Sequence, residues 1–203
     1  SMSDDIDLGR WRNYMLQNGI TTFFPTTVTE DRDRIERSVE RLSGADGIYL
    51  EGPYINAEKR GAHDEKKIRT ADAGLLDKIS DKLKFVALAP EFEDNLRMIP
   101  ELVSRGVKVS AGHSAADYAT ARKAFDLGVT QLVHTFNAMG PLGHREPGLV
   151  GAALEDERVF CEVISDGIHL HPAIVRILST ILGPKRMVLI SDSMAATGLD
   201  DGD

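Results

Sequence analysis

The feature that most constrains this chain is a repeat. Along its 203 residues, a short and nearly continuous apolar run is followed seven times by a stretch of helical character. Successive runs begin roughly 23 to 37 residues apart, which is the length of a βα unit. Runs of this kind are typical of parallel strands covered on both faces. We expect strands within Thr21–Thr26, Gly47–Pro53, Lys84–Pro90, Lys108–Ser114, Gln131–Asn137, Phe160–Gly167 and Met187–Ser193.

Three of the intervening stretches have the periodicity and the end signals of amphipathic helices. Ser114 is the predicted N-cap of one of them, and Gly128 its stop. Pro172 is expected at the first helical position of another. The predicted helices are Arg32–Ser43, Ala115–Leu127 and Pro172–Leu182.

Seven βα units in a row indicate an α/β protein, a (β/α)₈ TIM-type barrel that holds strands two to eight. A doubly wound open sheet is the alternative. Polar or Pro-containing clusters at the ends of six runs favour the barrel, because there the carboxyl ends of all strands meet on one face. These clusters are Pro25-Thr26, Glu51-Gly52-Pro53, His113-Ser114, His134–Asn137, Asp166-Gly167 and Asp192-Ser193.

Composition narrows the class of protein. Residues 1–203 are expected to form a single barrel domain, with Ser1-Met2 interpreted as a cloning scar. A formal net charge of −8 argues against nucleic acid or an anionic membrane as partner. It allows a phosphorylated substrate, since one well-placed Arg can hold a phosphate. No apolar stretch has the roughly 18 residues of a membrane span. The single cysteine, Cys161, is expected to be a buried, reduced side chain in a cytoplasmic protein.

Three strand ends carry residues that suit a metal ion. Glu51, His113 and His134 each close a different predicted strand, so a barrel would bring them together. Two imidazoles and one carboxylate leave a coordination position open, which is the pattern of a catalytic zinc site. Each residue taken alone is as readily explained as a polar strand tip. Asp192, at the end of the last strand, is placed either to move protons beside an activated water or to cap the following helix.

Several segments together resemble the family of N-acetylglucosamine-6-phosphate deacetylases, within the amidohydrolase superfamily. The resemblance extends from about residue 19 to the end of the chain. It is carried by Leu50-Glu-Gly-Pro-Tyr-Ile, Arg60-Gly-Ala-His63, Gly112-His-Ser, His134-Thr-Phe-Asn-Ala-Met, Arg145-Glu-Pro-Gly, Asp166-Gly-Ile-His and Ile190-Ser-Asp.

The resemblance implies a metal-dependent hydrolase that releases acetate from N-acetylglucosamine 6-phosphate in amino-sugar catabolism. It implies one divalent ion, Zn²⁺ or Fe²⁺, held by Glu51, His113 and His134. Asp192 would be the catalytic acid and base, and His63 would contact the acetyl carbonyl. The implied partners are the phosphosugar and a second copy of the chain in a homodimer. The implied sugar-phosphate contacts are Asn137, the Ala138 backbone, Arg145 (which in the family can reach across a dimer interface) and His169.

The chain also departs from that family. No His-x-His motif precedes residue 21, and His169-Leu-His171 lies in the wrong place to replace it. Strand one and the small β-sandwich of the family are therefore expected to lie outside this chain. Without that strand two sheet edges are exposed, so we expect marginal stability or pairing with another chain. Two other functions stay open: a metal-dependent deaminase on the same scaffold, and a barrel that binds phosphosugar or metal without turnover.

Overall fold

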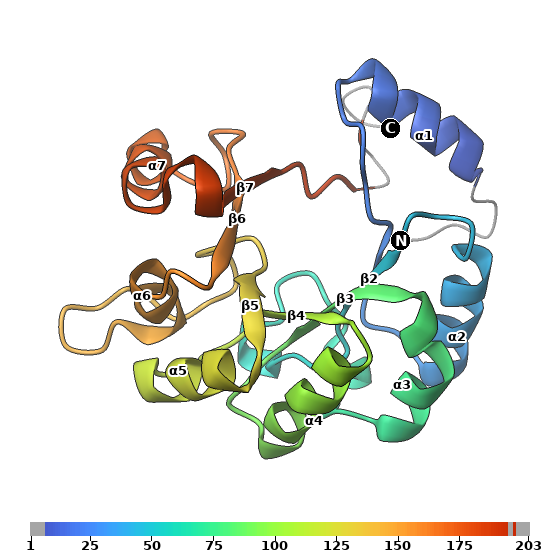
Figure 1. Cartoon of the computed structure of the whole chain (residues 1–203), viewed down its shortest axis with the longest axis horizontal. Helices are drawn as coiled ribbons and strands as arrows, with labels where there is room; N and C mark the ends of the chain where they lie inside the picture. Colours follow the sequence, from blue (N-terminus) through green and yellow to red (C-terminus); the bar gives the residue numbers. More distant parts are fainter. Residues whose placement is uncertain (1–6, 195–196, 198–203) are drawn as a thin grey trace.

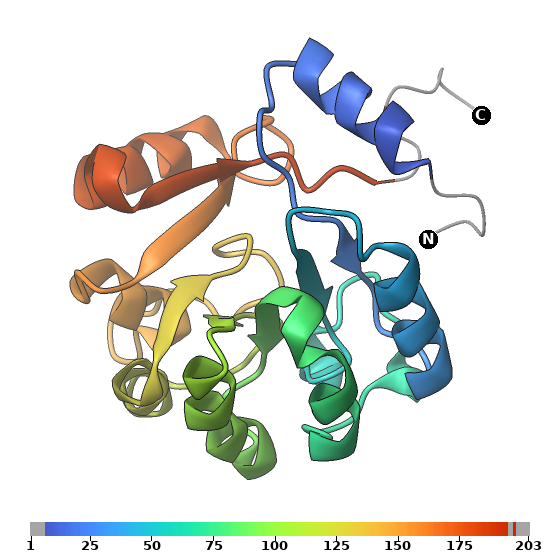
Figure 2. The same cartoon turned by 45° about the vertical axis from the view of Figure 1, so that its right-hand side comes forward.

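A computed structural model describes residues 7–194 and 197 of the chain. Its centre is one sheet of seven parallel strands in the order β1-β2-β3-β4-β5-β6-β7, each paired with its neighbour in sequence. The sheet curls into an incomplete barrel (Figures 1 and 2). The strands are β1 (Thr26–Thr27), β2 (Ile48–Glu51), β3 (Leu83–Leu88), β4 (Lys108–Ala111), β5 (Val129–Leu132), β6 (Phe160–Ile164) and β7 (Met187–Ile190).

Helices α2 to α7 cover the outer side of this curved sheet, one after most strands, as Figure 2 shows. Helix α1 lies apart from them, across the open side of the curl. The helices are α1 (Leu8–Gln17), α2 (Arg32–Arg41), α3 (Ala73–Ile79), α4 (Glu93–Ser104), α5 (Tyr118–Leu127), α6 (Gly148–Glu155) and α7 (Pro172–Arg186). Short 3₁₀ turns lie at Ala57–Lys59, Glu65–Lys67 and Ser80–Lys82.

Both faces of the sheet are apolar, which explains why the runs do not alternate. On β2, Leu50 packs in the large core between sheet and helices. The neighbouring Tyr49 belongs to a second, smaller cluster, in which its ring stacks on that of Phe85 with centroids 5.0 Å apart. Successive side chains of a strand point to opposite faces. A strand buried on both sides therefore needs an apolar residue at almost every position.

The partial barrel predicted from the repeat is confirmed. A doubly wound sheet contains a point at which the strand order reverses, and the order seen here runs from β1 to β7 without reversal. Cys161 is fully buried in β6, as expected, and burial raises the pKa of its thiol to about 11. Within the described part of the chain, no helix has the length and hydropathy that a membrane span requires. Ser1-Met2 falls outside the described residues.

The helix predictions hold with one correction. Gly128 ends α5 in the left-handed region, with φ of 119°. Pro172 opens α7, and Gly183 has a non-helical conformation where that helix was expected to end. The N-cap of α5, however, is Asp117, whose side chain accepts a hydrogen bond from the Thr120 N–H. Ser114 was the wrong choice because its hydroxyl donates to Glu91 instead, in the loop before the helix.

Candidate metal centre

The barrel brings together the three strand-end residues. Glu51 is the last residue of β2, while His113 and His134 each lie two residues beyond the ends of β4 and β5. All three are buried, with relative exposures of 8%, 4% and 4%. Both histidines have positive φ angles, 46° and 28°. This conformation is uncommon outside glycine, and it is found where a functional geometry requires it.

The three side chains meet through single atoms. Glu51 Oε1 lies 3.0 Å from His113 Nε2 and 2.9 Å from His134 Nε2, and the two Nε2 atoms are 2.9 Å apart. Ligands bound about 2.0–2.2 Å from one tetrahedral zinc ion are separated from each other by about 3.3–3.6 Å. Widening each of these separations by about half an ångström would therefore convert the cluster into three ligands of such a site.

The hydrogen bonds of His113 decide which of its nitrogens faces the cluster. Its Nδ1 lies 2.8 Å from the carbonyl oxygen of Lys59. A carbonyl only accepts, so Nδ1 carries the proton and Nε2 directs a lone pair at Glu51 and His134. An outer hydrogen bond of this kind is the usual companion of a metal-binding histidine. The donor set therefore fits one divalent transition ion, with carboxylate oxygen and imidazole nitrogen suiting Zn²⁺ or Fe²⁺.

The electrostatics of the cluster are consistent with a metal site. Burial alone would raise the pKa of Glu51, but the two neighbouring histidines lower it below its ordinary value. Burial alone would lower the pKa of His134, but the hydrogen bond to Glu51 raises it. The cluster thus stabilises a positive charge between these groups, and a metal ion competes with a proton for that position.

His63 lies beside the cluster, with its ring edge-to-face against that of His113 and centroids 4.7 Å apart. Potential ligand atoms of Glu51, His63 and His113 all lie within 4.8 Å of one another, which makes a second possible trio. We favour His134 over His63 as the third ligand because its contacts with Glu51 and His113 are shorter. In addition, His63 Nδ1 is already hydrogen-bonded to Thr29. Burial lowers the pKa of His63 to about 4, so this ring is neutral at neutral pH.

Gly52 follows Glu51 directly and packs against Thr29. Its replacement is predicted to destabilise the protein. Its φ is +69°, and a Cβ atom there would lie 2.0 Å from Thr29 Oγ1 and 3.3 Å from Thr29 Cα. We expect Gly52→Ala to lower the free energy of unfolding by about 3 kcal/mol, from backbone strain and overpacking together. Urea unfolding measures this change.

The matched control is Gly140→Ala, because a Cβ at Gly140 meets no atom within 4 Å. We expect that variant to stay within about 1 kcal/mol of wild type. Equal stabilities for the two variants would show that the packing of Gly52 against Thr29 is not tight.

Asp192 lies two residues beyond β7, at the same end of the barrel. Its φ is 50°, and part of the residue is exposed to solvent. Partial burial of the carboxylate and the nearby charge of Glu51 raise its pKa, while His134 and His169 lower it. Asp192 is thus close enough to Glu51 and His134 for their charges to affect its pKa.

The residues expected to contact the sugar phosphate lie in the loop between β5 and α6 and in the loop after β6. Asn137 and Ala138 lie three and four residues after His134, and Asn137 Nδ2 donates to the His134 carbonyl at 3.3 Å. Arg145 lies in the exposed loop before α6 and forms no ion pair with any described residue. The structure thus places Asn137 beside the cluster and leaves the Arg145 guanidinium at the surface.

His169 stands in the loop after β6 and contacts Asp166, whose role could not be predicted from the sequence. The Asp166 carboxylate accepts the His169 backbone N–H at 2.9 Å and lies 2.7 Å from His169 Nδ1. Backbone N–H groups of His169 and Ile168, followed by the His169 ring, lower the pKa of Asp166 to about 2. This carboxylate therefore holds Nδ1 of His169 as a donor.

Glu162 is a second residue that sequence reasoning missed. It is a buried carboxyl group on β6 that accepts a hydrogen bond from the His134 backbone N–H at 3.3 Å and another from Gln131. Burial raises its pKa to about 7. The available signal was a Glu in the middle of an apolar strand, where a charged residue is rarely found without a partner. Its contact supports the backbone from which the His134 side chain projects.

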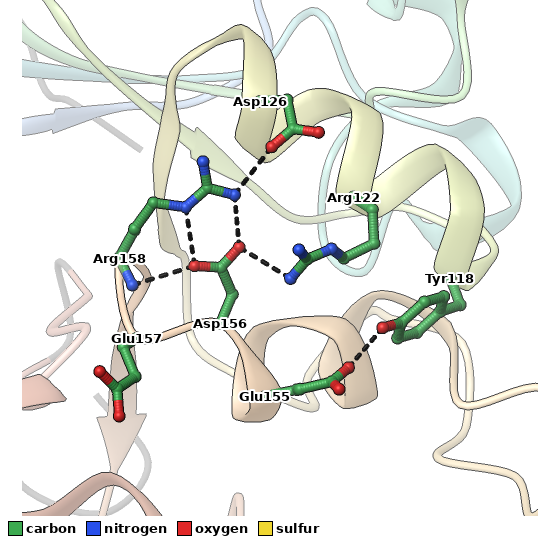
Figure 3. Close-up of a pocket in the computed structure, with 7 residues that line it drawn as sticks. All are labelled: Tyr118, Arg122, Asp126, Glu155, Asp156, Glu157 and Arg158. Carbon is green, nitrogen blue, oxygen red and sulfur yellow. Dashed lines mark hydrogen bonds and ion pairs between the residues drawn. The ribbon is translucent and has the colours of Figure 1, made fainter.

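A surface pocket outside the strand ends is filled by charged side chains that bond to one another (Figure 3). Asp156 forms ion pairs with Arg122 at 2.9 Å and with Arg158 at 2.6 Å. The network connects α5 with the segment between α6 and β6, and the hydrogen bond from Tyr118 to Glu155 connects α5 with α6. The pocket is lined by Tyr118, Arg122, Asp126, Glu155, Asp156, Glu157 and Arg158.

The chain is similar in sequence to known proteins. The sequence profile of the Amidohydrolase family matches residues 12–200. The chain is 41% identical over 200 residues to N-acetylgalactosamine-6-phosphate deacetylase from Escherichia coli O157:H7, covering 92% of this chain and 53% of that protein. It is 39% identical over 208 residues to N-acetylglucosamine-6-phosphate deacetylase from Danio rerio, covering 93% and 51%.

A solved structure agrees in fold. A mutant of N-acetyl-D-glucosamine-6-phosphate deacetylase from Mycobacterium smegmatis, in complex with N-acetyl-D-glucosamine-6-phosphate, superposes with a TM-score of 0.91 at 39% identity. The match covers 97% of this chain and 55% of that one. The chain thus spans about half the length of the proteins that it matches. The family profile covers nearly all of the chain, and the chain therefore belongs to the metal-dependent amidohydrolase family.

Proposed function

We propose that the protein removes the acetyl group from N-acetylglucosamine 6-phosphate, giving glucosamine 6-phosphate and acetate. The observation that carries this proposal is the convergence of Glu51, His113 and His134 at the carboxyl ends of three strands. The named activities of the relatives from Danio rerio and Mycobacterium smegmatis support the choice of substrate.

The chemistry of amide hydrolysis assigns work to each group. A divalent ion held by Glu51, His113 and His134, with Zn²⁺ our first choice, would polarise the acetyl carbonyl and lower the pKa of a water. In this proposal Asp192 takes a proton from the attacking water while the oxygen of the water bonds to the carbonyl carbon. The same carboxyl group then delivers the proton to the sugar nitrogen as the C–N bond breaks.

Binding residues set the position of the acetamide. In this proposal His63 donates a hydrogen bond to the carbonyl oxygen, where negative charge develops. Asn137 and the Ala138 backbone lie in the loop after β5, and His169 in the loop after β6, to contact the sugar phosphate. Arg145 would supply paired donors to the phosphate, a geometry that a lysine cannot offer.

The relative from Escherichia coli adds a second candidate substrate, N-acetylgalactosamine 6-phosphate. The two sugars share the acetamide and the phosphate and differ in the configuration of one ring hydroxyl. The catalytic groups described above serve both equally, so a choice between them depends on contacts to that hydroxyl.

Acetate release tests the proposal. The 203-residue chain, loaded with Zn²⁺, is supplied with each phosphosugar and with N-acetylglucosamine lacking the phosphate. We expect kcat/KM for the preferred phosphosugar to exceed that for the unphosphorylated sugar by about 100-fold, the value of one or two charge-assisted contacts. Chelator-treated chain is the control and is expected to be inactive.

Equal rates with and without the phosphate would contradict the proposed substrate class. Release of ammonia from a nucleobase would favour the deaminase alternative instead. Zn²⁺ binding without acetate release from any sugar would favour a barrel that binds without turnover.

A further inference from the structure

The contacts of His63 indicate which of its two ring nitrogens carries the proton. Its Nδ1 atom accepts a hydrogen bond from the Thr29 backbone N–H at 3.1 Å and lies 2.8 Å from Thr29 Oγ1. Thr29 is 3% exposed and follows β1 by two residues. Both contacts therefore come from one buried residue beside the sheet, 34 residues away in the sequence.

The direction of the first bond determines where the ring proton sits. A backbone N–H can only donate, so Nδ1 must offer its lone pair to Thr29. A neutral imidazole has one donor and one acceptor nitrogen, and the proton of His63 is consequently on Nε2. With Nδ1 occupied, Nε2 is the nitrogen left to face Glu51 and His113, whose ligand atoms lie within 4.8 Å of His63.

The local structure is built to keep Thr29 in this place. Gly52 follows Glu51 directly, and only the absence of its Cβ leaves room for the Thr29 side chain, 2.0 Å from where that atom would be. The Thr29 amide, the hydroxyl and the His63 ring are thus packed against the strand end that carries Glu51.

We propose that Thr29 is a positioning residue that holds His63 in the Nε2–H tautomer, so that His63 presents a hydrogen-bond donor to the centre and not a metal-binding lone pair. This contrasts with His113, whose Nδ1 is bonded to a carbonyl and whose Nε2 lone pair faces the centre. Two neighbouring histidines are therefore set to opposite roles by the single partner of each Nδ1. The use of that donor on the acetyl carbonyl rests on the proposed function.

Nitrogen NMR of the full chain tests the tautomer without any turnover. In long-range ¹H–¹⁵N spectra, with His63→Gln used for assignment, we expect a protonated Nε2 and an unprotonated Nδ1 for His63. A through-hydrogen-bond coupling is expected between His63 Nδ1 and the Thr29 amide nitrogen. On addition of Zn²⁺, His113 and His134 should change and His63 should keep its tautomer. A protonated Nδ1, or a His63 nitrogen that binds Zn²⁺, would overturn the proposal.

Two variants test the positioning role. Thr29→Val keeps the amide donor and loses the hydroxyl, whereas Thr29→Ser keeps both. We expect Thr29→Val to lower kcat about fivefold, the effect of one hydrogen bond, with KM and Zn²⁺ affinity unchanged, and Thr29→Ser to restore kcat. An unchanged kcat in Thr29→Val, or a loss that Thr29→Ser does not restore, would contradict the role.

The proposed deacetylase function and the proposed role of Thr29 can be contradicted independently of each other. If the wild-type chain releases no acetate, the proposed function fails, while the NMR spectra still decide the tautomer. If acetate is released but His63 carries its proton on Nδ1, the deacetylase proposal stands and the role of Thr29 is wrong.

Discussion

Replacing Asp192 with Asn is expected to lower kcat for acetate release by about 10²–10⁴-fold, the usual contribution of a general acid and base. The amide side chain has nearly the same size and cannot take up a proton. KM should change little, because the proposed role is in proton transfer and not in holding the sugar. Steady-state acetate release on the Zn²⁺-loaded chain measures both constants.

The neighbouring Ser193→Ala is the control for that substitution, since it alters the same exposed segment after β7 without removing a proton-transfer group. Its kcat should stay near that of wild type. If Asp192→Asn is as active as wild type, Asp192 is not the base, and its position beside the cluster has another purpose. A parallel fall in both variants would show that the segment is needed for structure.

Removal of the His134 imidazole is expected to weaken Zn²⁺ binding by more than about 100-fold. Loss of a residue that only hydrogen-bonds to a metal ligand can already weaken binding by about 100-fold, and loss of a ligand should cost more. Its Nε2 contacts both Glu51 and His113, so His134→Ala opens one side of the donor set. Competition with a chromophoric chelator measures the dissociation constant.

Two histidine controls sharpen that measurement. His144→Ala removes an exposed loop histidine and should leave Zn²⁺ affinity unchanged. His63→Gln should also leave it unchanged, because His63 is assigned as a donor. A large loss in His63→Gln with little loss in His134→Ala would favour the trio of Glu51, His63 and His113 instead.

The parts of the fold that sequence could predict are those set by periodicity. Seven apolar runs became seven parallel strands, of which β2, β4 and β6 are almost fully buried, while β7 at the edge of the sheet leaves Leu189 exposed. Strand ends alone were enough to group Glu51, His113 and His134. Local signals were less reliable near loops. The first run forms only the two-residue β1, and the hydroxyl of Ser114 bonds to Glu91, so it does not cap α5.

The supporting residues could not be predicted, because their contacts depend on how distant loops fold back. Thr29 meets His63 across 34 residues, and Glu162 meets His134 across 28. Neither contact follows from the period of a strand or helix. The homodimer and the phosphate contact of Arg145 stay predictions from the family resemblance, and the cytoplasmic location stays a prediction from the single cysteine.

The most direct test of the candidate centre is a crystal of the chain with Zn²⁺, measured on both sides of the zinc absorption edge. We predict one anomalous peak bonded to a Glu51 carboxylate oxygen and to Nε2 of His113 and His134. A peak bonded to His63 in place of His134, or no peak among these residues, would contradict the account.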